Sequence, residues 1–162
     1  MSKPKKVSDT GRTPMDAAFR FLARARTIRE VERHLDACEY GEVEVYDTVE
    51  RLKDLGLLND TAYAEDFVRT RLATKPVSRA HLREQLLSHE TDMDAIEQAL
   101  LAVDDETQQK SAVSIAEKYA RQYSNLAEEE RNEMVIRRLL ARGYSYDDAR
   151  AALAEATGER DE

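Results

Sequence analysis

The chain has 162 residues, of which 36% are charged, 41% are hydrophobic and only 6% are aromatic, with no Trp. Five Gly and three Pro are too few for the many turns of a β-sandwich or barrel, so the composition favours helices. Lys and Arg number 25 against 33 Asp and Glu, and the resulting net charge of −8 excludes a protein that coats nucleic acid through its overall charge.

Other features of the sequence indicate a compartment. No apolar stretch reaches the roughly 18–20 residues that a membrane-spanning helix needs, and the polar N-terminal residues do not resemble a signal peptide. The single cysteine, Cys38, excludes an intramolecular disulfide framework. We therefore expect a cytoplasmic protein without a membrane partner.

The first third of the chain predicts three consecutive amphipathic helices. Their apolar residues recur every three or four positions, as on a helix with one buried face. These residues are Ala18, Phe21, Leu22 and Ala25, then Ile28, Val31, Leu35 and Cys38, then Val45, Val49, Leu52 and Leu55. Thr27 and Glu30 have the spacing of a capping box at the start of the second helix, and Gly56 is suited to end the third.

The same pattern occurs twice more along the chain. Corresponding positions in the three copies include Ala18, Ala64 and Ala112, then Val31, Leu82 and Val135, then Val45, Ile96 and Ala149. The residue before each predicted third helix is an acceptable N-cap, and these residues are Gly41, Asp92 and Ser145. Thr27 corresponds to Ser78, another N-cap residue type.

We therefore predict an all-α fold of three tandem three-helix repeats, over 14–56, 57–105 and 106–157, forming an elongated, curved protein. Each repeat is too small to bury much core alone, so stability should depend partly on contacts between neighbours. Residues 1–13 are expected to be a disordered basic tail and 158–162 a C-terminal tail. We expect a monomer.

Charge is distributed unevenly along the chain. Its net value is +6 over residues 1–29, −9 over 30–66, +4 over 67–89, −7 over 90–109, +2 over 110–142 and −4 over 143–162. A local basic surface can act on an acidic protein because salt screens exposed charges beyond about 8–10 Å. The alternative interpretation is that these charges only solvate helix surfaces.

The basic segments contain the candidate partner-binding residues. The most coherent cluster, opposed only by Glu84, consists of Arg69, Arg71, Lys75, Arg79 and Arg83. A second group consists of Arg20, Arg24, Arg26 and Arg29. Their expected role is electrostatic docking.

No pattern predicts catalysis. The five Gly are too far apart for a phosphate-binding loop, and His34, His81 and His89 lack metal-ligand spacing. We expect Cys38 to be a buried structural thiol. We therefore predict no enzyme activity, cofactor or metal site.

The tyrosines allow two interpretations. Tyr63, Tyr119 and Tyr123 lie on or near apolar stripes, which favours core packing. Tyr40, Tyr144 and Tyr146 lie at predicted connections, where exposed rings could stack on bases.

Three segments carry a resemblance to a known family. Residues 56–71 read GLLNDTAYAEDFVRTR, residues 22–31 read LARARTIREV, and residues 138–144 read RLLARGY, followed by Asp147, Asp148 and Ala149. In order and spacing they resemble the motifs of the RecX family, regulators of the RecA recombinase, over about residues 14–156. One departure is Lys75-Pro76-Val77, where that family often has Gly.

The resemblance implies binding within the helical groove of the RecA filament on single-stranded DNA, where filament growth, ATP hydrolysis and strand exchange would be limited. A weak direct contact with DNA is possible within this hypothesis. Two alternatives remain open from the residues alone. One is a helical-repeat adaptor for another protein, and the other is a helix-turn-helix regulator with residues 78–89 in the major groove.

Overall fold

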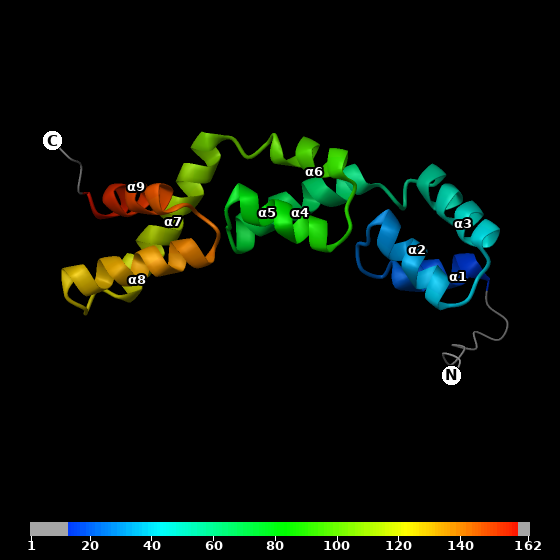
Figure 1. Cartoon of the computed structure of the whole chain (residues 1–162), viewed down its shortest axis with the longest axis horizontal. Coiled ribbons are helices and arrows are strands. Elements are labelled where there is room, and N and C mark those ends of the chain that lie inside the picture. Colours follow the sequence, from blue (N-terminus) through cyan, green and yellow to red (C-terminus); the bar gives the residue numbers. More distant parts are fainter. Residues whose placement is uncertain (1–12, 159–162) are drawn as a thin grey trace.

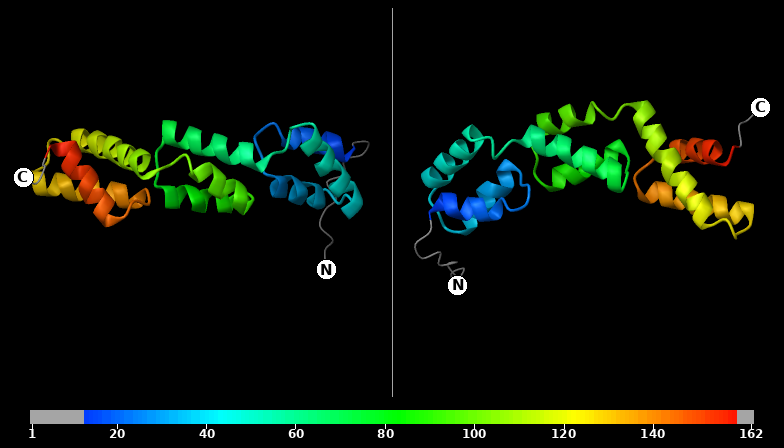
Figure 2. Two further views of the ribbon diagram at one scale, coloured as in Figure 1. Left: turned by 90° about the horizontal axis from the view of Figure 1, so that it is seen from above. Right: turned by 180° about the vertical axis from the view of Figure 1, so that it is seen from behind.

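A computed structural model describes residues 13–158, and over that range the chain forms nine α-helices and no strand. The helices are α1 (Pro14–Phe21), α2 (Ile28–Ala37), α3 (Glu42–Asp54), α4 (Asp60–Thr74), α5 (Arg79–Ser88), α6 (Met93–Leu100), α7 (Asp105–Gln122), α8 (Glu128–Ala141) and α9 (Tyr146–Thr157). They form three groups of three along the long axis of the molecule (Figure 1). The same row is visible from above and from behind (Figure 2). The predicted all-α, elongated fold of three-helix repeats is confirmed.

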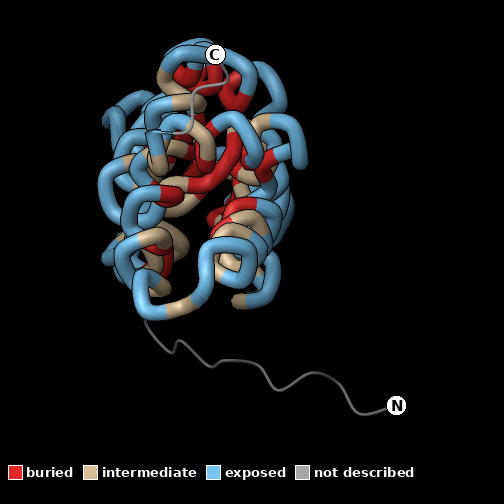
Figure 3. Tube along the Cα trace, turned by 90° about the vertical axis from the view of Figure 1, so that its left-hand side faces the viewer, coloured by how far each residue is buried: buried red, intermediate tan, exposed pale blue. Residues whose placement is uncertain are grey.

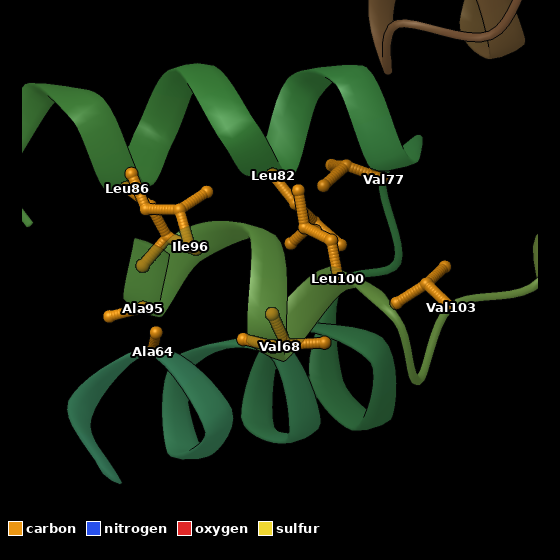
Figure 4. Close-up of a cluster of buried hydrophobic side chains, with 10 residues drawn as sticks. Ala64, Val68, Val77, Leu82, Leu86, Ala95, Ile96, Leu100 and Val103 are labelled. Carbon is orange, nitrogen blue, oxygen red and sulfur yellow. The ribbon is translucent and has the colours of Figure 1, made fainter. Parts of the chain in front are cut away.

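Each three-helix group has its own hydrophobic cluster. We call the groups the first (α1–α3), second (α4–α6) and third (α7–α9) repeats. Seen along the row, the segments of buried residues lie mostly toward the middle of the molecule and those of exposed residues toward its outside (Figure 3). In the second repeat, Ala64 and Val68 of α4 face Leu82 of α5 and Ile96 of α6 (Figure 4). The limits 14–56, 57–105 and 106–157 remain our proposal for the exact extent of the units.

Side-chain caps explain where most of the helices begin. Thr27 and Glu30 form the predicted capping box, and Ser78 and Ser145 each accept a hydrogen bond from the main-chain N–H three residues later. Asn59 caps α4, which begins at Asp60. The predicted tails over 1–13 and 158–162 lie outside the described residues, except Thr13, which caps α1, and Gly158, which ends α9 in a left-handed conformation.

Four sequence-based expectations about burial are wrong. Helix α1 ends at Phe21, so Ala25 lies in the following connection and is exposed. Leu55 is the C-cap of α3 and is 56% exposed, and Cys38 ends α2 at a half-buried position. Tyr144, expected at an exposed connection, packs into the cluster of the third repeat, where burial raises its pKa to about 12.

The junction between the first and second repeats depends on the carboxylate of Asp60. One oxygen accepts a hydrogen bond from the N–H of Ile28 at 2.9 Å, and the other accepts one from the N–H of Asp92 at 2.8 Å. These N–H groups lie at the starts of α2 and α6, where helices leave donors unpaired and favour negative charge. The fully buried hydroxyl of Thr27 adds a 2.7 Å hydrogen bond to the carbonyl of His89. Polar groups therefore join the two repeats.

The junction between the second and third repeats also uses main-chain groups. The N–H of Ser78 donates to the carbonyl of Arg142 at 2.9 Å, and the Arg142 side chain donates back to the carbonyl of Pro76 at 2.9 Å. Gly143 has a φ of +90°, and a Cβ there would lie 2.5 Å from Ser78 Oγ and 2.8 Å from His81 Cβ. Only glycine fits this close approach.

Replacing Asp60 with Ala is expected to lower the free energy of unfolding by about 1–3 kcal/mol, because two partly buried N–H groups lose their acceptors. Chemical denaturation measures the change. Glu65→Ala, at an exposed position on the same helix, is the matched control and should stay within about 0.5 kcal/mol of wild type. Equal effects of the two substitutions would contradict the role of Asp60.

Gly143→Ala is expected to destabilise more than Gly56→Ala in thermal or chemical unfolding. Both glycines have positive φ, so each substitution costs about 1–2 kcal/mol of backbone strain. A Cβ on Gly56 would have no neighbour within 4 Å, whereas a Cβ on Gly143 would also meet Ser78 and His81. The overlap should add about 1–3 kcal/mol. Equal losses of stability would contradict this expectation, because they would show that the junction accommodates the added methyl group with no further loss of stability.

Candidate functional site

The structure divides the predicted basic cluster. Arg83 forms a two-pronged ion pair with Glu97 of α6, at 2.8 and 3.3 Å. Arg79 donates to the carbonyl of Val103 at 2.7 Å and to Asp105 at 2.9 Å. These two arginines therefore have a structural role that the sequence does not indicate.

The other three members of the cluster lie on or at the end of α4. Arg69 is exposed and pairs with Asp66, one turn earlier on the same helix. Arg71 and Lys75 face the third repeat, and they line a cleft together with residues at the end of α8. Arg71 also lies over the Phe67 ring, with 5.2 Å between its guanidinium carbon and the ring centroid.

The cleft between the second and third repeats, here called the basic cleft, gathers cations from both. Its lining residues are Arg71, Lys75, Val77, His81, Gln85, Tyr119, Arg138, Ala141 and Arg142. None of these is a carboxylate. Among residues 13–158, its four cations form no ion pair within 4.0 Å, unlike Arg79 and Arg83. The cleft therefore presents uncompensated positive charge.

Two helix C-termini position these cations. Arg71 lies in the last turn of α4 and Lys75 is its C-cap, while Arg138 lies in the last turn of α8 and Arg142 is its C-cap. Cations are favoured at helix C-termini, where main-chain carbonyls carry partial negative charge. The two cations at the end of α4 and the two at the end of α8 are thus each stabilised by their own helix. The junction through Ser78 and Arg142 brings the two helix ends together.

Tyr119 of α7 forms the wall of the basic cleft on the side of the third repeat. Its phenol oxygen accepts a hydrogen bond from Arg142 at 3.1 Å, and the guanidinium carbon of Arg138 lies 5.3 Å from its ring centroid. The hydrogen bond from Arg142 holds the pKa of the Tyr119 phenol below its usual value. The shift is a consequence of the arginines that surround this phenol.

The second predicted group, in the first repeat, is also divided. Arg20 and Arg24 are exposed. Arg26 lies over the Phe21 ring at 4.1 Å, and Arg29 pairs with Glu32 at 3.0 Å. Arg20 and Arg24 therefore remain available for a partner, whereas Arg26 and Arg29 are engaged by neighbouring side chains, Arg29 also by Glu90 of the second repeat at 3.6 Å.

The histidines and the acidic side chains of the described region are arranged as follows. Between residues 13 and 158, His, Cys, Asp and Glu side chains do not gather in groups of three or more that could hold a metal ion. Within the same range, every helix is too short or too polar to span a bilayer. His34 stacks on Phe21 with ring centroids 4.0 Å apart, and His81 lines the basic cleft.

Comparisons with known proteins agree with the all-α architecture of three-helix units. A family model described as "RecX, second three-helix domain" matches residues 59–100, which include all of α4, α5 and α6. The crystal structure of RecX from Lactobacillus salivarius superposes with a TM-score of 0.77 at 30% sequence identity, covering 89% of this chain and 94% of that one. The chain belongs to the RecX family.

Curated relatives extend the RecX match along the chain. A protein of Bacillus subtilis is 31% identical over 146 residues, and one of Listeria welshimeri is 26% identical over 157 residues. Both are named regulatory protein RecX. The matches cover 90% and 96% of this chain but only 55% and 58% of the relatives. The chain thus spans little more than half the length of these RecX proteins.

The sequence of this RecX-family chain did not point to two cations of the basic cleft, Arg138 and Arg142. Both lie within the RLLARGY segment that carries part of the RecX resemblance, but their charge is diluted by nearby carboxylates in the sequence. Their position in the last turn of a helix before Gly143 is a signal that could have paired them with Arg71 and Lys75, at the end of α4.

The phenol of Tyr119 is expected to ionise with a pKa below the usual value of about 10. A spectrophotometric titration of wild type minus Tyr119→Phe isolates this group. Arg142→Gln should move the isolated midpoint upward because the hydrogen bond is lost, while Arg137→Gln, on the exposed face of the same helix, should not. A wild-type midpoint at or above 10 would contradict the electrostatics described for the cleft.

Proposed function

We propose that this chain is a non-catalytic regulator that binds the RecA filament on single-stranded DNA and lowers its ATPase and recombinase activities. Membership of the RecX family is the observation that carries the proposal, since its relatives are named regulatory proteins. The setting would be the cytoplasm, in DNA repair and the SOS response. The protein would act as a monomer and without a cofactor.

The shape and charge of the chain support this function. The row of three repeats presents a long surface (Figure 1). A surface of this kind suits an extended partner such as the groove of a helical filament. Exposed Arg20 and Arg24 and the basic cleft lie in different repeats, so contacts would be spread along the row. Acidic segments between them disfavour indiscriminate binding to DNA.

The two alternative functions differ in what the structure offers them. For a helix-turn-helix regulator, α5 would enter the major groove, but Arg79 and Arg83 at its start are engaged by Val103, Asp105 and Glu97. This engagement disfavours base reading by α5. A helical-repeat adaptor for another protein predicts no effect on RecA, so the experiment below separates it.

Sub-stoichiometric addition of the protein is expected to lower the turnover of ATP by RecA on single-stranded DNA. The physical reason is that one bound chain blocks filament growth beyond its own position, so fewer chains than RecA subunits are needed. Co-sedimentation with filaments measures binding in parallel. Unchanged turnover without co-sedimentation would overturn the proposal.

A matched pair of variants tests whether the exposed arginines of the first repeat contribute to docking. Arg24→Glu should weaken co-sedimentation several-fold, and the effect should shrink at high salt. Arg51→Glu makes the same charge change at an exposed position on α3 and should bind like wild type. Equal weakening by the two substitutions would indicate that net charge alone governs binding.

A further inference from the structure

We infer that the basic cleft binds the phosphate backbone of a single DNA strand, and that the neighbouring groove along α4 receives its bases. The inference rests on the proposed function because it assigns a place for the DNA component of the filament. It adds a defined site, made jointly by the second and third repeats.

The hydrogen-bond donors of the basic cleft are only partly used within the protein. Within the described residues, the side chains of Arg71 and Lys75 donate no hydrogen bond, and Arg138 uses only its Nε, toward Tyr123 at 3.1 Å. Arg142 is different, because both of its terminal nitrogens are engaged, by Pro76 and Tyr119. Arg142 therefore builds the cleft, and the other three cations have donors left for a ligand.

The remaining donors of the basic cleft match the oxygens of a phosphate. Guanidinium groups present paired N–H donors that fit the oxygens of a phosphate, and an ammonium group adds a point charge. Four cations close together repel one another, and no carboxylate lines the cleft to offset this repulsion. A bound anion removes the repulsion, so the site is suited to an anionic ligand.

A groove along α4 adjoins the basic cleft. Its lining residues are Ala25, Tyr63, Asp66, Phe67, Thr70, Arg71 and Thr74. Arg71 lines both the groove and the basic cleft, so the two adjoin at this side chain. Tyr63 and Phe67 lie with ring centroids 6.3 Å apart and an interplanar angle of 23°.

This combination distinguishes a nucleic acid strand from a free anion. Single strands are bound where bases stack on aromatic rings and phosphates meet Arg and Lys. Tyr63 and Phe67 are half-buried against the core of the second repeat, and their remaining exposed surface lines the groove. Arg71, Lys75 and Arg138 offer the cations at one end. An acidic peptide would also meet the cations, so the abasic oligonucleotide described below tests whether stacked bases contribute to binding.

The test uses binding of fluorescent oligo(dT) to the full chain at low salt, measured by anisotropy. The double variant Lys75→Gln/Arg138→Gln is expected to bind at least tenfold more weakly than wild type. Its dependence of log affinity on log salt should flatten by about 0.7 for each phosphate that is no longer neutralised. Unchanged thermal stability would show that the weaker binding is not due to unfolding.

The matched control is Lys110→Gln/Arg137→Gln, which removes the same two charges. Both residues lie on helices of the third repeat, but they pair with Glu106 and Glu133 and lie outside the cleft. The control is expected to stay within twofold of wild type. Equal weakening of the two double variants, or no binding of oligo(dT) by wild type at low salt, would overturn the inference.

Two further ligands test the contributions of the bases and of the phosphates to binding separately. An abasic oligonucleotide of the same length should bind more weakly than oligo(dT), because it has phosphates but no bases to stack. Inorganic phosphate should compete only weakly. Equal affinity of the abasic strand, or displacement by phosphate at concentrations comparable to the oligonucleotide, would overturn the strand assignment in favour of a simple anion site.

Co-sedimentation with RecA filaments distinguishes failure of this inference from failure of the proposed function. If wild type binds filaments but its oligo(dT) affinity is unchanged by the cleft variant, only the inference fails. If wild type binds oligo(dT) through the cleft but neither binds filaments nor changes ATP turnover, only the proposed function fails.

Discussion

Main-chain polar groups at helix ends hold the three repeats together, and the arrangement of every candidate surface depends on them. Asp60 accepts hydrogen bonds from N–H groups at the starts of α2 and α6, which belong to different repeats. A three-helix unit of this size buries only a small core, so junctions of defined geometry must add to its stability. Because a helix leaves its first N–H groups unpaired, one carboxylate in the right place satisfies two helices at once.

The second junction uses the same principle and also creates the candidate site. Arg142 donates to the carbonyl of Pro76 and to Tyr119, while its own carbonyl accepts from Ser78. Gly143 permits this approach because a Cβ would overlap Ser78 and His81. The contacts that orient the third repeat therefore also place Arg138 in the same cleft as Arg71. Structure and candidate function cannot be separated at this position.

Charge in this protein is organised at two scales. Over the whole chain, acidic residues exceed basic ones and give the net charge of −8. Within the described residues, several prominent cations are neutralised locally, Arg83 by Glu97 and Arg69 by Asp66, whereas the basic cleft gathers four cations that are not. A partner that approaches this acidic molecule therefore meets attraction at a defined position, which favours specificity over general affinity.

The sequence by itself determined the helices and their repetition. The capping box of Thr27 and Glu30 and the caps at Ser78 and Ser145 were readable because such hydrogen bonds join residues three apart. Apolar stripes predicted the clusters for a similar reason, although Ala25 and Leu55 at helix ends were misjudged because the exact last residue depends on the turn that follows. Motifs within the chain were sufficient for the RecX resemblance.

Only the tertiary structure decided which charged groups are free. Arg79 and Arg83 belong to the same basic segment as Arg71 and Lys75, yet their partners Asp105 and Glu97 lie further along the chain. Arg138 and Arg142 lie in a different repeat from Arg71 and reach the same cleft only through the orientation of the third repeat. That orientation depends on hydrogen bonds between repeats, and no local spacing in the sequence encodes it.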